Sequence, residues 1–270
     1  MTADNRPRSI PELVALKQAG RPIVMVTCYD ATFARLLDRA AVDVLLVGDS
    51  VNTVVTGHAT TLSATLPQML YHAAAVRRGA PNVPLVVDLP FLTYQVSVEE
   101  AIRNAGRILA ETGANAVKLE GGEAMVPTVR ALVERGIPVV GHLGLLPQSV
   151  QASGGYRVQG RQAKAADQLV ADAKALEEAG ASMLILELVP AALAARATKA
   201  IGIPTVGIGA GAGCNGQVLV LYDLLGLDDR FNPRFLRKYA DLSASVVAAV
   251  EAFGKEVREG KYPGKEHSFE

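Results

Sequence analysis

The sequence predicts a (β/α)8 barrel of the α/β class. Short apolar runs alternate with amphipathic stretches almost from end to end of the 270 residues. Continuous runs of Val, Ile and Leu between turn residues are typical of parallel strands covered on both faces. Seven or eight such βα units in this length favour a closed barrel. The first run is followed by Tyr29 and Asp30 rather than by the glycines of a dinucleotide-binding turn, which disfavours a doubly wound sheet.

The predicted strands follow one another at spacings that leave room for a helix between most of them. Seven are clear: residues 24–28, 43–48, 84–88, 116–120, 138–142, 183–187 and 204–209. An eighth, residues 217–223, could equally begin a helix. A long helix over roughly residues 233–259 should follow, and the last residues read as a surface tail or an interface arm.

Glycines mark the ends of the predicted helices. One helix has a capping-box pattern at Ser97 and Glu100 and ends at Gly113; two others end at Gly136 and Gly180. Each glycine shortly precedes a strand, as expected for a left-handed cap closing an αβ loop. No linker or second composition regime interrupts the pattern, so residues 1–270 should form a single barrel domain with a C-terminal helical tail.

The composition excludes several classes of protein. Lys plus Arg and Asp plus Glu both number 27, which gives no global argument for a nucleic-acid or membrane partner. No secretory signal is evident, and no apolar run approaches the roughly 20 residues that span a bilayer. Cys28 and Cys214 are far apart, which argues against a disulfide framework or a zinc site. A reduced, cytoplasmic protein is expected.

Several predicted strands end in charged or titratable residues, although a carboxylate is costly in an apolar interior. In a barrel, the carboxyl ends of the strands and the loops after them carry the catalytic groups. These side chains should therefore line an active-site mouth. The six residues are Asp49, Asp88, Lys118, Glu120, His142 and Glu187.

Three of these residues suit a metal ion. Asp49, Asp88 and Glu120 are hard oxygen donors without a histidine or thiolate at metal spacing, a set that suits Mg²⁺. A single aspartate at a strand end often only caps the next helix, but three acids on three strands strengthen the metal hypothesis.

Lys118 and Glu120 are two residues apart, so a strand points both to one face. Spacing alone favours a salt bridge between them. In the functional alternative, Glu120 holds the metal and Lys118 meets a substrate carboxylate. A Schiff base on Lys118 is disfavoured, because nearby carboxylates stabilise the ammonium form.

Glu187 follows an apolar run, and desolvation of its carboxylate would favour proton uptake, as a general base requires. A carboxylate satisfied by backbone N–H groups is the alternative. His142 is either a proton relay or substrate hydrogen-bond donor, or a structural histidine. The glycine-rich residues 207–213 suit a phosphate site or a tight turn against a flat ring, and residues 147–161 suit an active-site flap.

Ordered motifs over nearly the whole chain closely resemble the ketopantoate hydroxymethyltransferase family. They are VTCYDATFA, VGDS, YHAAAVRRGAPNVPLVVDLPF, NAVKLEGGE, VVGHLGLLPQSV, GGYRVQGR, LELVP, GIGAG and YPGKEHSF. The resemblance implies a barrel of the phosphoenolpyruvate/pyruvate type and a homodecamer. It also implies transfer of a one-carbon unit from 5,10-methylenetetrahydrofolate to 3-methyl-2-oxobutanoate, giving 2-dehydropantoate in pantothenate (coenzyme A) biosynthesis.

The resemblance also implies residue roles. Asp49 and Asp88 match the metal-binding aspartates, which also meet the substrate, and Glu120 the third metal-associated acid; Ser50 and Lys118 match contacts to the substrate carboxylate, and Glu187 the proton acceptor. Val51, Asn52, Thr53 and Asn215 depart from the family pattern at positions that are neither metal ligands nor the base.

The expected mechanism has Glu187 remove the C3 proton of a 2-oxo acid whose enolate is stabilised by Mg²⁺. One alternative is a Mg²⁺-dependent 2-oxo acid lyase or mutase on the same barrel. A lyase would carry a catalytic cysteine on a mobile loop, a role that suits neither Cys28 nor Cys214. The other is a non-catalytic barrel that binds a 2-oxo acid or folate and has no need of a base.

Overall fold

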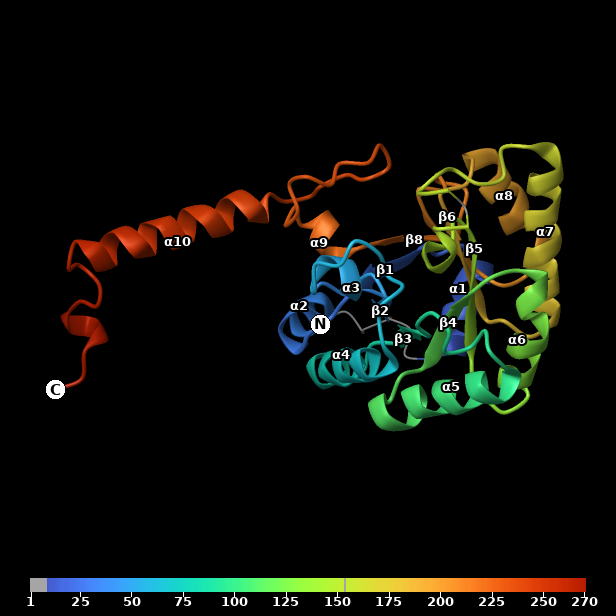
Figure 1. The fold of residues 1–270 in the computed structure, drawn as a ribbon, viewed down its shortest axis with the longest axis horizontal. Coiled ribbons are helices and arrows are strands. Elements are labelled where there is room, and N and C mark those ends of the chain that lie inside the picture. Colours follow the sequence, from blue (N-terminus) through green and yellow to red (C-terminus); the bar gives the residue numbers. More distant parts are fainter. Residues whose placement is uncertain (1–8, 153) are drawn as a thin grey trace. The chain divides into compact units, whose positions relative to one another are not determined.

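The computed structural model describes residues 9–152 and 154–270, which divide into two compact units, Met1–Val220 and Leu221–Glu270. The first unit holds eight parallel strands closed into a barrel, with β1 paired to β8 (Figure 1). The strands are β1 Ile23–Thr27, β2 Val44–Val47, β3 Leu85–Asp88, β4 Ala116–Glu120, β5 Val139–Gly144, β6 Met183–Glu187, β7 Thr205–Ile208 and β8 Gly216–Leu219. The predicted closed barrel is confirmed, and a doubly wound sheet is excluded.

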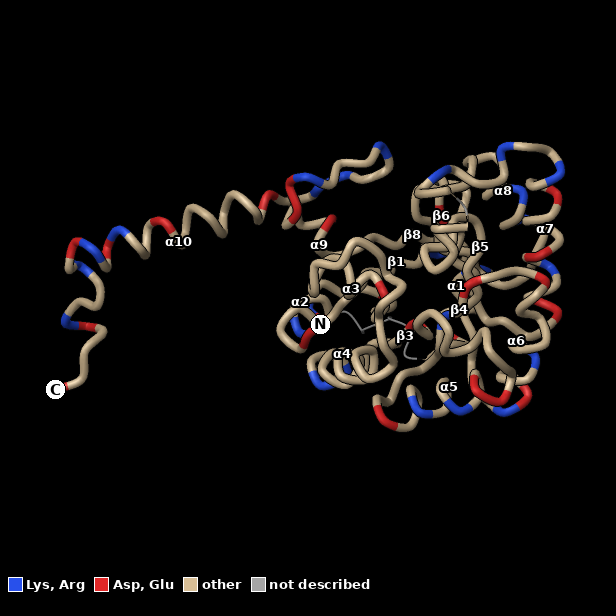
Figure 2. Tube along the Cα trace, in the orientation of Figure 1, with Lys and Arg blue, Asp and Glu red and all other residues tan. Residues whose placement is uncertain are grey.

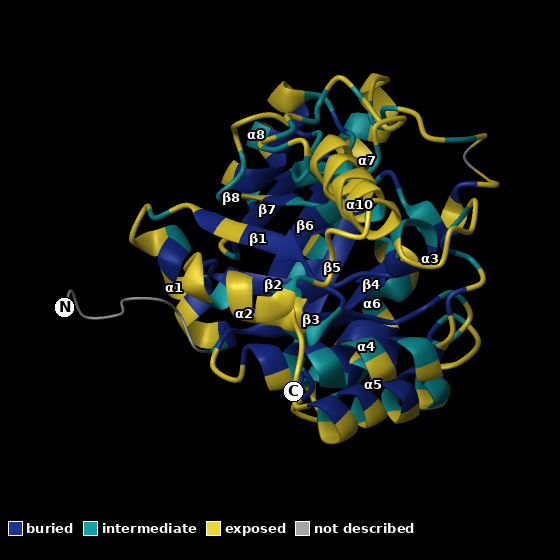
Figure 3. Cartoon of the chain, turned by 90° about the vertical axis from the view of Figure 1, so that its left-hand side faces the viewer, coloured by how far each residue is buried: buried dark blue, intermediate teal, exposed yellow. Residues whose placement is uncertain are grey.

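Helices follow most of the strands, and most of them cover the outside of the barrel; residues 209–215, between β7 and β8, form no helix. The helices are α1 Ile10–Gln18, α2 Ala31–Arg39, α3 Val51–Val54, α4 Leu66–Gly79, α5 Val98–Thr112, α6 Val126–Val133, α7 Ala163–Glu178 and α8 Ala191–Ala200, with short 3-10 helices at Glu123–Met125 and Pro147–Ser149. The strands are mostly buried, with exposed positions at Val24 in β1 and Gln217 in β8, whereas α4 and α5 alternate buried and exposed faces (Figure 3). Charges of both signs lie along α5 and α7 (Figure 2). This is the two-sided burial that the apolar strand sequences predict.

The predicted Ser97 cap and the glycine caps are present, but the second bond of the predicted capping box, from the Ser97 N–H to the Glu100 side chain, does not form between these described residues. The Ser97 side chain accepts a hydrogen bond from the Glu100 N–H (3.1 Å) at the start of α5. Gly113, Gly136 and Gly180 have φ values of 70°, 77° and 97°, the left-handed region in which a residue with a Cβ is strained. These glycines end the helices and return the chain to the amino end of the next strand.

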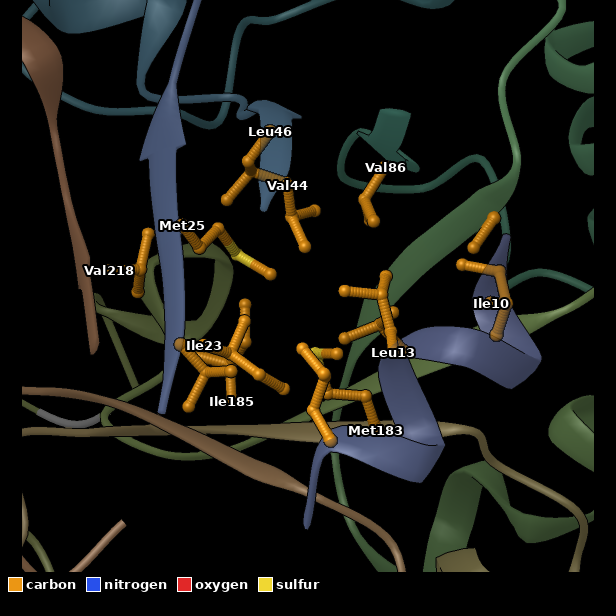
Figure 4. Close-up of a cluster of buried hydrophobic side chains, with 14 residues drawn as sticks. Ile10, Leu13, Ile23, Met25, Val44, Leu46, Val86, Met183, Ile185 and Val218 are labelled. Atoms are coloured by element: carbon orange, nitrogen blue, oxygen red, sulfur yellow. The ribbon is translucent and has the colours of Figure 1, made fainter. Parts of the chain in front are cut away.

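Helix α1, which the βα pattern does not predict, closes the amino end of the barrel. Its apolar side chains pack against residues that point into the barrel from several strands (Figure 4). The cluster consists of Ile10, Leu13, Leu16, Ile23, Met25, Val44, Leu46, Val86, Ala116, Val140, Met183, Ile185, Val206 and Val218. Apolar side chains therefore fill the amino end of the barrel, and a polar site can form only at the carboxyl end.

Two predicted element boundaries near the start of the second unit differ from the structure. The eighth strand ends at Leu219, and Leu221–Leu224 forms helix α9. Helix α10 spans Leu242–Arg258 and so begins nine residues later than the predicted start at residue 233. In the segment between, the N–H groups of Tyr239 and Leu242 donate to carbonyls of Leu224 and Leu225, a competing set of bonds that keeps this stretch out of a helix.

Helix α10 has no buried residue within its unit. Its exposed apolar side chains include Val246, Val247, Val250 and Phe253, and a short 3-10 helix, Lys265–His267, follows it. The single domain over residues 1–270 and the interface arm both stay predictions. In the described part of the chain, no helix combines the length and the apolar character needed to cross a membrane.

Candidate active site

The six charged or titratable residues predicted at strand ends come together at the carboxyl end of the barrel. Asp88 ends β3, Glu120 ends β4 and Glu187 ends β6, while Asp49 follows β2 by two residues. The strand register sets Asp88 beside Lys118 and Glu120 beside His142. Parallel pairing therefore turns separate positions in the sequence into one cluster.

Lys118 lies at the centre of this cluster and is 4% exposed. Its Nζ is 3.2 Å from His142 Nδ1, 3.3 Å from Asp88 Oδ1 and 3.9 Å from Glu120 Oε1. Burial opposes the charged form, but Asp88, Glu120 and Asp49 outweigh it and raise the pKa of Lys118. The ammonium is thus held charged, which agrees with the argument against a Schiff base. The salt bridge predicted from spacing exists, but it is the longest of the three contacts.

The three acids compete for too few positive charges. Asp88 Oδ2 accepts a hydrogen bond from the Asp49 N–H (3.0 Å). Burial, with Asp88 and Glu120 close by, raises the pKa of Asp49 to about 8, and burial also raises the pKa of Asp88. At Glu120 burial acts in the same direction, but His142 and Lys118 outweigh it and lower the pKa. The cluster therefore favours a proton on an aspartate unless further positive charge is supplied.

Several buried atoms of the cluster have no hydrogen-bond partner among the described residues. They include Asp88 Oδ1, Glu120 Oε1 and His142 Nε2. A buried acceptor without a donor costs about 1–3 kcal/mol. The two oxygens have only longer contacts to charged groups, Asp88 Oδ1 to Lys118 Nζ at 3.3 Å and Glu120 Oε1 to His142 Nδ1 at 3.4 Å, so each keeps the capacity to accept a cation or a group of the substrate.

His142 joins Glu120 to Glu187. Its Nδ1 is 3.4 Å from Glu120 Oε1, and its Nε2 is 3.3 Å from Glu187 Oε2. Burial and Lys118 oppose its protonation, but the carboxylates of Glu120 and Glu187 outweigh them and raise the pKa of His142. The Glu187 side chain keeps 18% of its surface exposed, so it is the most accessible acid of the cluster.

Three further residues belong to the site and were missed in the sequence. The Tyr29 hydroxyl is 2.8 Å from Ser50 Oγ, the side chain predicted to meet the substrate carboxylate. Tyr94 OH accepts a hydrogen bond from the Glu120 N–H (3.1 Å). Gln148 Nε2 donates to Asp49 Oδ2 (2.9 Å). All three are neutral, so no charge at a strand end marks them.

The acids were predicted to hold Mg²⁺, and the donor set fits a hard cation, with oxygens that lack hydrogen-bond partners. Within residues 9–152 and 154–270, however, no three His, Cys, Asp or Glu side chains are arranged closely enough to enclose a metal ion by themselves. Water or substrate oxygens would have to complete the coordination.

The glycine-rich residues 207–213 serve close packing on α8. A Cβ added at Gly211 would lie 2.5 Å from Ala191 Cβ, and one added at Gly213 would lie 2.7 Å from Ala195 Cβ. Residues 147–161 begin with the 3-10 helix Pro147–Ser149 and include exposed Tyr156. The proposed flap contains residue 153, which lies outside the described residues.

Neither cysteine is a reactive thiol. Burial raises the pKa of Cys28 to about 12, and burial also raises the pKa of Cys214. A thiolate nucleophile needs the opposite shift.

Comparison with known proteins identifies the family. The family model described as ketopantoate hydroxymethyltransferase matches residues 8–265. A protein of Moorella thermoacetica named 3-methyl-2-oxobutanoate hydroxymethyltransferase is 55% identical over 97% of each chain, and one of Syntrophus aciditrophicus with the same name is 52% identical over 100% of each.

Among solved structures, phosphoenolpyruvate phosphomutase from Streptomyces platensis subsp. rosaceus has a TM-score of 0.63 at 16% identity, over 97% of this chain and 92% of that one. A 2,3-dimethylmalate lyase of the PEP mutase/isocitrate lyase superfamily has a TM-score of 0.60 at 20% identity, over 94% and 89%. These likenesses show the barrel fold alone. The family model and the relatives show more: the chain belongs to the ketopantoate hydroxymethyltransferase family.

Proposed function

We propose that the cluster at the carboxyl end of the barrel converts 3-methyl-2-oxobutanoate to ketopantoate, with Glu187 as the base and a divalent cation on Asp49, Asp88 and Glu120. Family membership carries the overall reaction, a step of pantothenate biosynthesis. The observation that carries the residue assignment is the convergence of three acids, Lys118 and His142 in one buried cluster beside a partly exposed glutamate.

A divalent cation would relieve the excess of negative charge. Asp49, Asp88 and Glu120 bring up to three negative charges against the ammonium of Lys118, while His142, whose pKa is raised, is shared between Glu120 and Glu187. Two of the buried carboxylate oxygens also lack a hydrogen-bond donor among the described residues. We therefore assign Mg²⁺ to these acids. When bound, it supplies Lewis-acid polarisation of the substrate's keto group and offsets the charge that grows there as the C3 proton leaves.

Lys118 and Ser50 are proposed to hold the substrate carboxylate. The Lys118 ammonium is kept charged by its acid neighbours, and the Ser50 hydroxyl is positioned by Tyr29. Two contacts to the carboxylate would fix the orientation of the substrate, so that its C3–H bond faces the base.

Glu187 is proposed to remove the C3 proton. Its Oε2 lies 3.3 Å from His142 Nε2, so the imidazole is placed to share or pass on the proton that Glu187 receives. C3 then attacks the methylene carbon of 5,10-methylenetetrahydrofolate, which is the proposed one-carbon donor. Both bonds from that carbon to the folate nitrogens N5 and N10 break, one before and one after C3 attacks; the two nitrogens take up protons, and water supplies the hydroxyl oxygen of the product.

The lyase alternative is disfavoured by the two cysteines, since burial raises the pKa of both thiols. A non-catalytic binding barrel would have no use for a glutamate paired with a histidine beside the acids. Cytoplasmic location is proposed from the cysteine content and composition, and a homodecamer from the resemblance; light scattering of the purified chain tests the second.

The test of the function is proton NMR of 3-methyl-2-oxobutanoate in D2O with the enzyme and Mg²⁺. We expect loss of the C3–H signal, and Glu187→Gln should slow it by roughly a hundredfold or more, the usual contribution of a general base. Adding methylenetetrahydrofolate should then give the hydroxymethylated product.

Glu177→Gln is the matched control. Glu177 accepts hydrogen bonds from the Gly202 and Ile203 N–H groups, away from the cluster, so exchange should be unchanged. Equal exchange in wild type and Glu187→Gln would remove Glu187 from the proposed role. Exchange that does not respond to Mg²⁺ or to its chelation would remove the cation.

A further inference from the structure

Gln148 is the least exposed residue of the 3-10 helix that follows β5, with 4% of its surface accessible. It carries no charge and titrates nowhere, so the proton chemistry proposed above does not use it. Its side chain nevertheless reaches into the acid cluster and contacts one of the proposed metal ligands directly.

The amide of Gln148 uses all of its hydrogen-bonding capacity. Nε2 has two hydrogens, which it donates to Asp49 Oδ2 and to the Leu89 carbonyl, both at 2.9 Å. Oε1 accepts from Tyr94 OH at 2.8 Å and from Gln95 Nε2 at 3.1 Å. The two hydrogen bonds donated by Nε2 and the two accepted by Oε1 fix the orientation of the amide. The opposite orientation would set its NH₂ group against the NH₂ of Gln95.

Gln148 also contacts a second acid through its main chain. Its N–H donates to Glu120 Oε2 at 3.0 Å, while Glu120 Oε1 has no hydrogen-bond partner among the described residues. One oxygen of Asp49 and one oxygen of Glu120 are thus engaged by the same residue. The other oxygen of each carboxylate is not bonded to Gln148; that of Glu120 lies 3.4 Å from His142 Nδ1 and 3.9 Å from Lys118 Nζ.

We propose that Gln148 is a positioning residue that orients the Asp49 and Glu120 carboxylates for a divalent cation. The proposal rests on the proposed function, which assigns a cation to these acids. Gln148 would act as an outer-shell partner, and loss of such partners typically weakens metal binding by about 10–100-fold.

The chemistry of the position favours glutamine. The side chain has to span from the Tyr94 hydroxyl to the Asp49 carboxylate, and Asn is one methylene too short to do so from the same backbone. A glutamate there would set a further carboxylate against Asp49. A neutral donor of this length holds the acids without adding to their repulsion.

The test is a titration of the full-length protein with Mn²⁺ alone, a hard divalent cation whose free form is measured by electron paramagnetic resonance. Gln148→Met keeps the length of the side chain and removes both donors. We expect its Kd for Mn²⁺ to rise at least tenfold, and Gln148→Asn to show the same effect if the Met variant does not fold.

Asn115→Leu is the matched control, because it removes a side-chain amide whose Oδ1 accepts from the Leu85 N–H and Arg77 at the other end of the barrel. It should lower the melting temperature and leave the Kd for Mn²⁺ within twofold. Wild-type affinity in folded Gln148→Met or Gln148→Asn would overturn the positioning role and leave the proposed function standing. A wild-type chain that binds no Mn²⁺ would overturn the positioning role and the assignment of a cation to these acids in the substrate-free protein, while the reaction, which rests on family membership, would stand.

Discussion

Charged side chains lie at both ends of the barrel, mostly part-buried at the amino end and buried at the carboxyl end, and their hydrogen bonding differs. At the amino end, Lys17 Nζ donates to the carbonyls of Thr198, Ile201 and Ile203 at 2.7–3.0 Å, and Arg21 pairs with Asp43. At the carboxyl end, Asp88 Oδ1 and Glu120 Oε1 are buried without a hydrogen-bond donor among the described residues.

This difference distinguishes charged groups that serve stability from charged groups that serve function. A buried charge whose hydrogen bonds are complete strengthens the fold, whereas one left incomplete destabilises it and persists where a ligand completes it. Arg77 at the amino end shows the contrast within one side chain, since only its Nε lacks a partner while its other two nitrogens donate to five oxygens. Burial of charge alone therefore does not mark the site; several unsatisfied atoms gathered in one place do.

The largest effect should come from exchanging one aspartate for asparagine at each end. Asp88→Asn removes a proposed metal ligand and the closest acid partner of Lys118, so kcat/KM should fall roughly a hundredfold or more. Asp43→Asn removes the partner of Arg21 and should leave kcat unchanged while lowering stability by about 1–3 kcal/mol. Steady-state kinetics and urea unfolding measure the two outcomes, and a catalytic loss in Asp43→Asn would break the separation between the ends.

A smaller effect is expected in the pH dependence of stability. Burial and the neighbouring carboxylates of Asp88 and Glu120 raise the pKa of Asp49 in the folded chain from its ordinary value of 3.8 to about 8. Between these values the unfolded chain releases this proton while the folded chain retains it, so the metal-free protein should lose stability as the pH rises from about 4 towards 8. The loss should be on the order of several kcal/mol at most.

Thermal melts of chelator-treated protein from pH 5 to 8 measure this loss. Asp49→Asn has no carboxyl to titrate and should flatten the profile. Saturating Mg²⁺ should do the same in wild type, because the cation displaces the proton. A metal-free wild type with equal stability at pH 5 and pH 8 would show that Asp49 is ionised in the folded chain.

The sequence predicts the barrel and the members of the acid cluster for one physical reason. Parallel strands buried on both faces are apolar throughout, so Asp88 or Glu187 at the end of such a run stands out. The spacing of residues in the sequence does not predict which residues of neighbouring strands lie side by side. Residues 118 and 120 predict a salt bridge along β4, but the pairing of β3 with β4 sets Lys118 opposite Asp88, which is its closer acid.

The features that were not predicted from the sequence depend on neutral hydrogen-bonding groups, on an element outside the repeat, or on competing hydrogen bonds. Gln148 and Tyr94 act through hydrogen bonds that no charge or period announces. Helix α1 lies outside the βα repeat that predicts the barrel. The start of α10 at Leu242 follows the Asp241 N-cap, whose side chain accepts a hydrogen bond from the Ala244 N–H. The N–H groups of Tyr239 and Leu242 donate instead to the carbonyls of Leu224 and Leu225, bonds that compete with a helix over the preceding residues.

The smallest effect should come from the glycine-rich residues after β7, which belong to the carboxyl end yet serve packing. Gly211 has φ 78°, and an added Cβ would meet Ala191 at 2.5 Å; Gly136, before β5 at the amino end, has φ 77° and open space around it. Gly136→Ala should therefore cost only the strain of a left-handed alanine, about 1 kcal/mol. Gly211→Ala adds overpacking and should cost about 1–3 kcal/mol more.

Chemical unfolding of the two variants measures the difference between their free energies of unfolding. Steady-state kinetics then test whether residues 207–213 contact a ligand. If residues 207–213 only pack on α8, Gly211→Ala should retain the KM for methylenetetrahydrofolate within about twofold, since a shift below 0.5 kcal/mol is what a position outside the binding site produces. A KM raised tenfold with little loss of stability would instead place a ligand against this loop. The functional part of the carboxyl end would then extend from the acid cluster to β7.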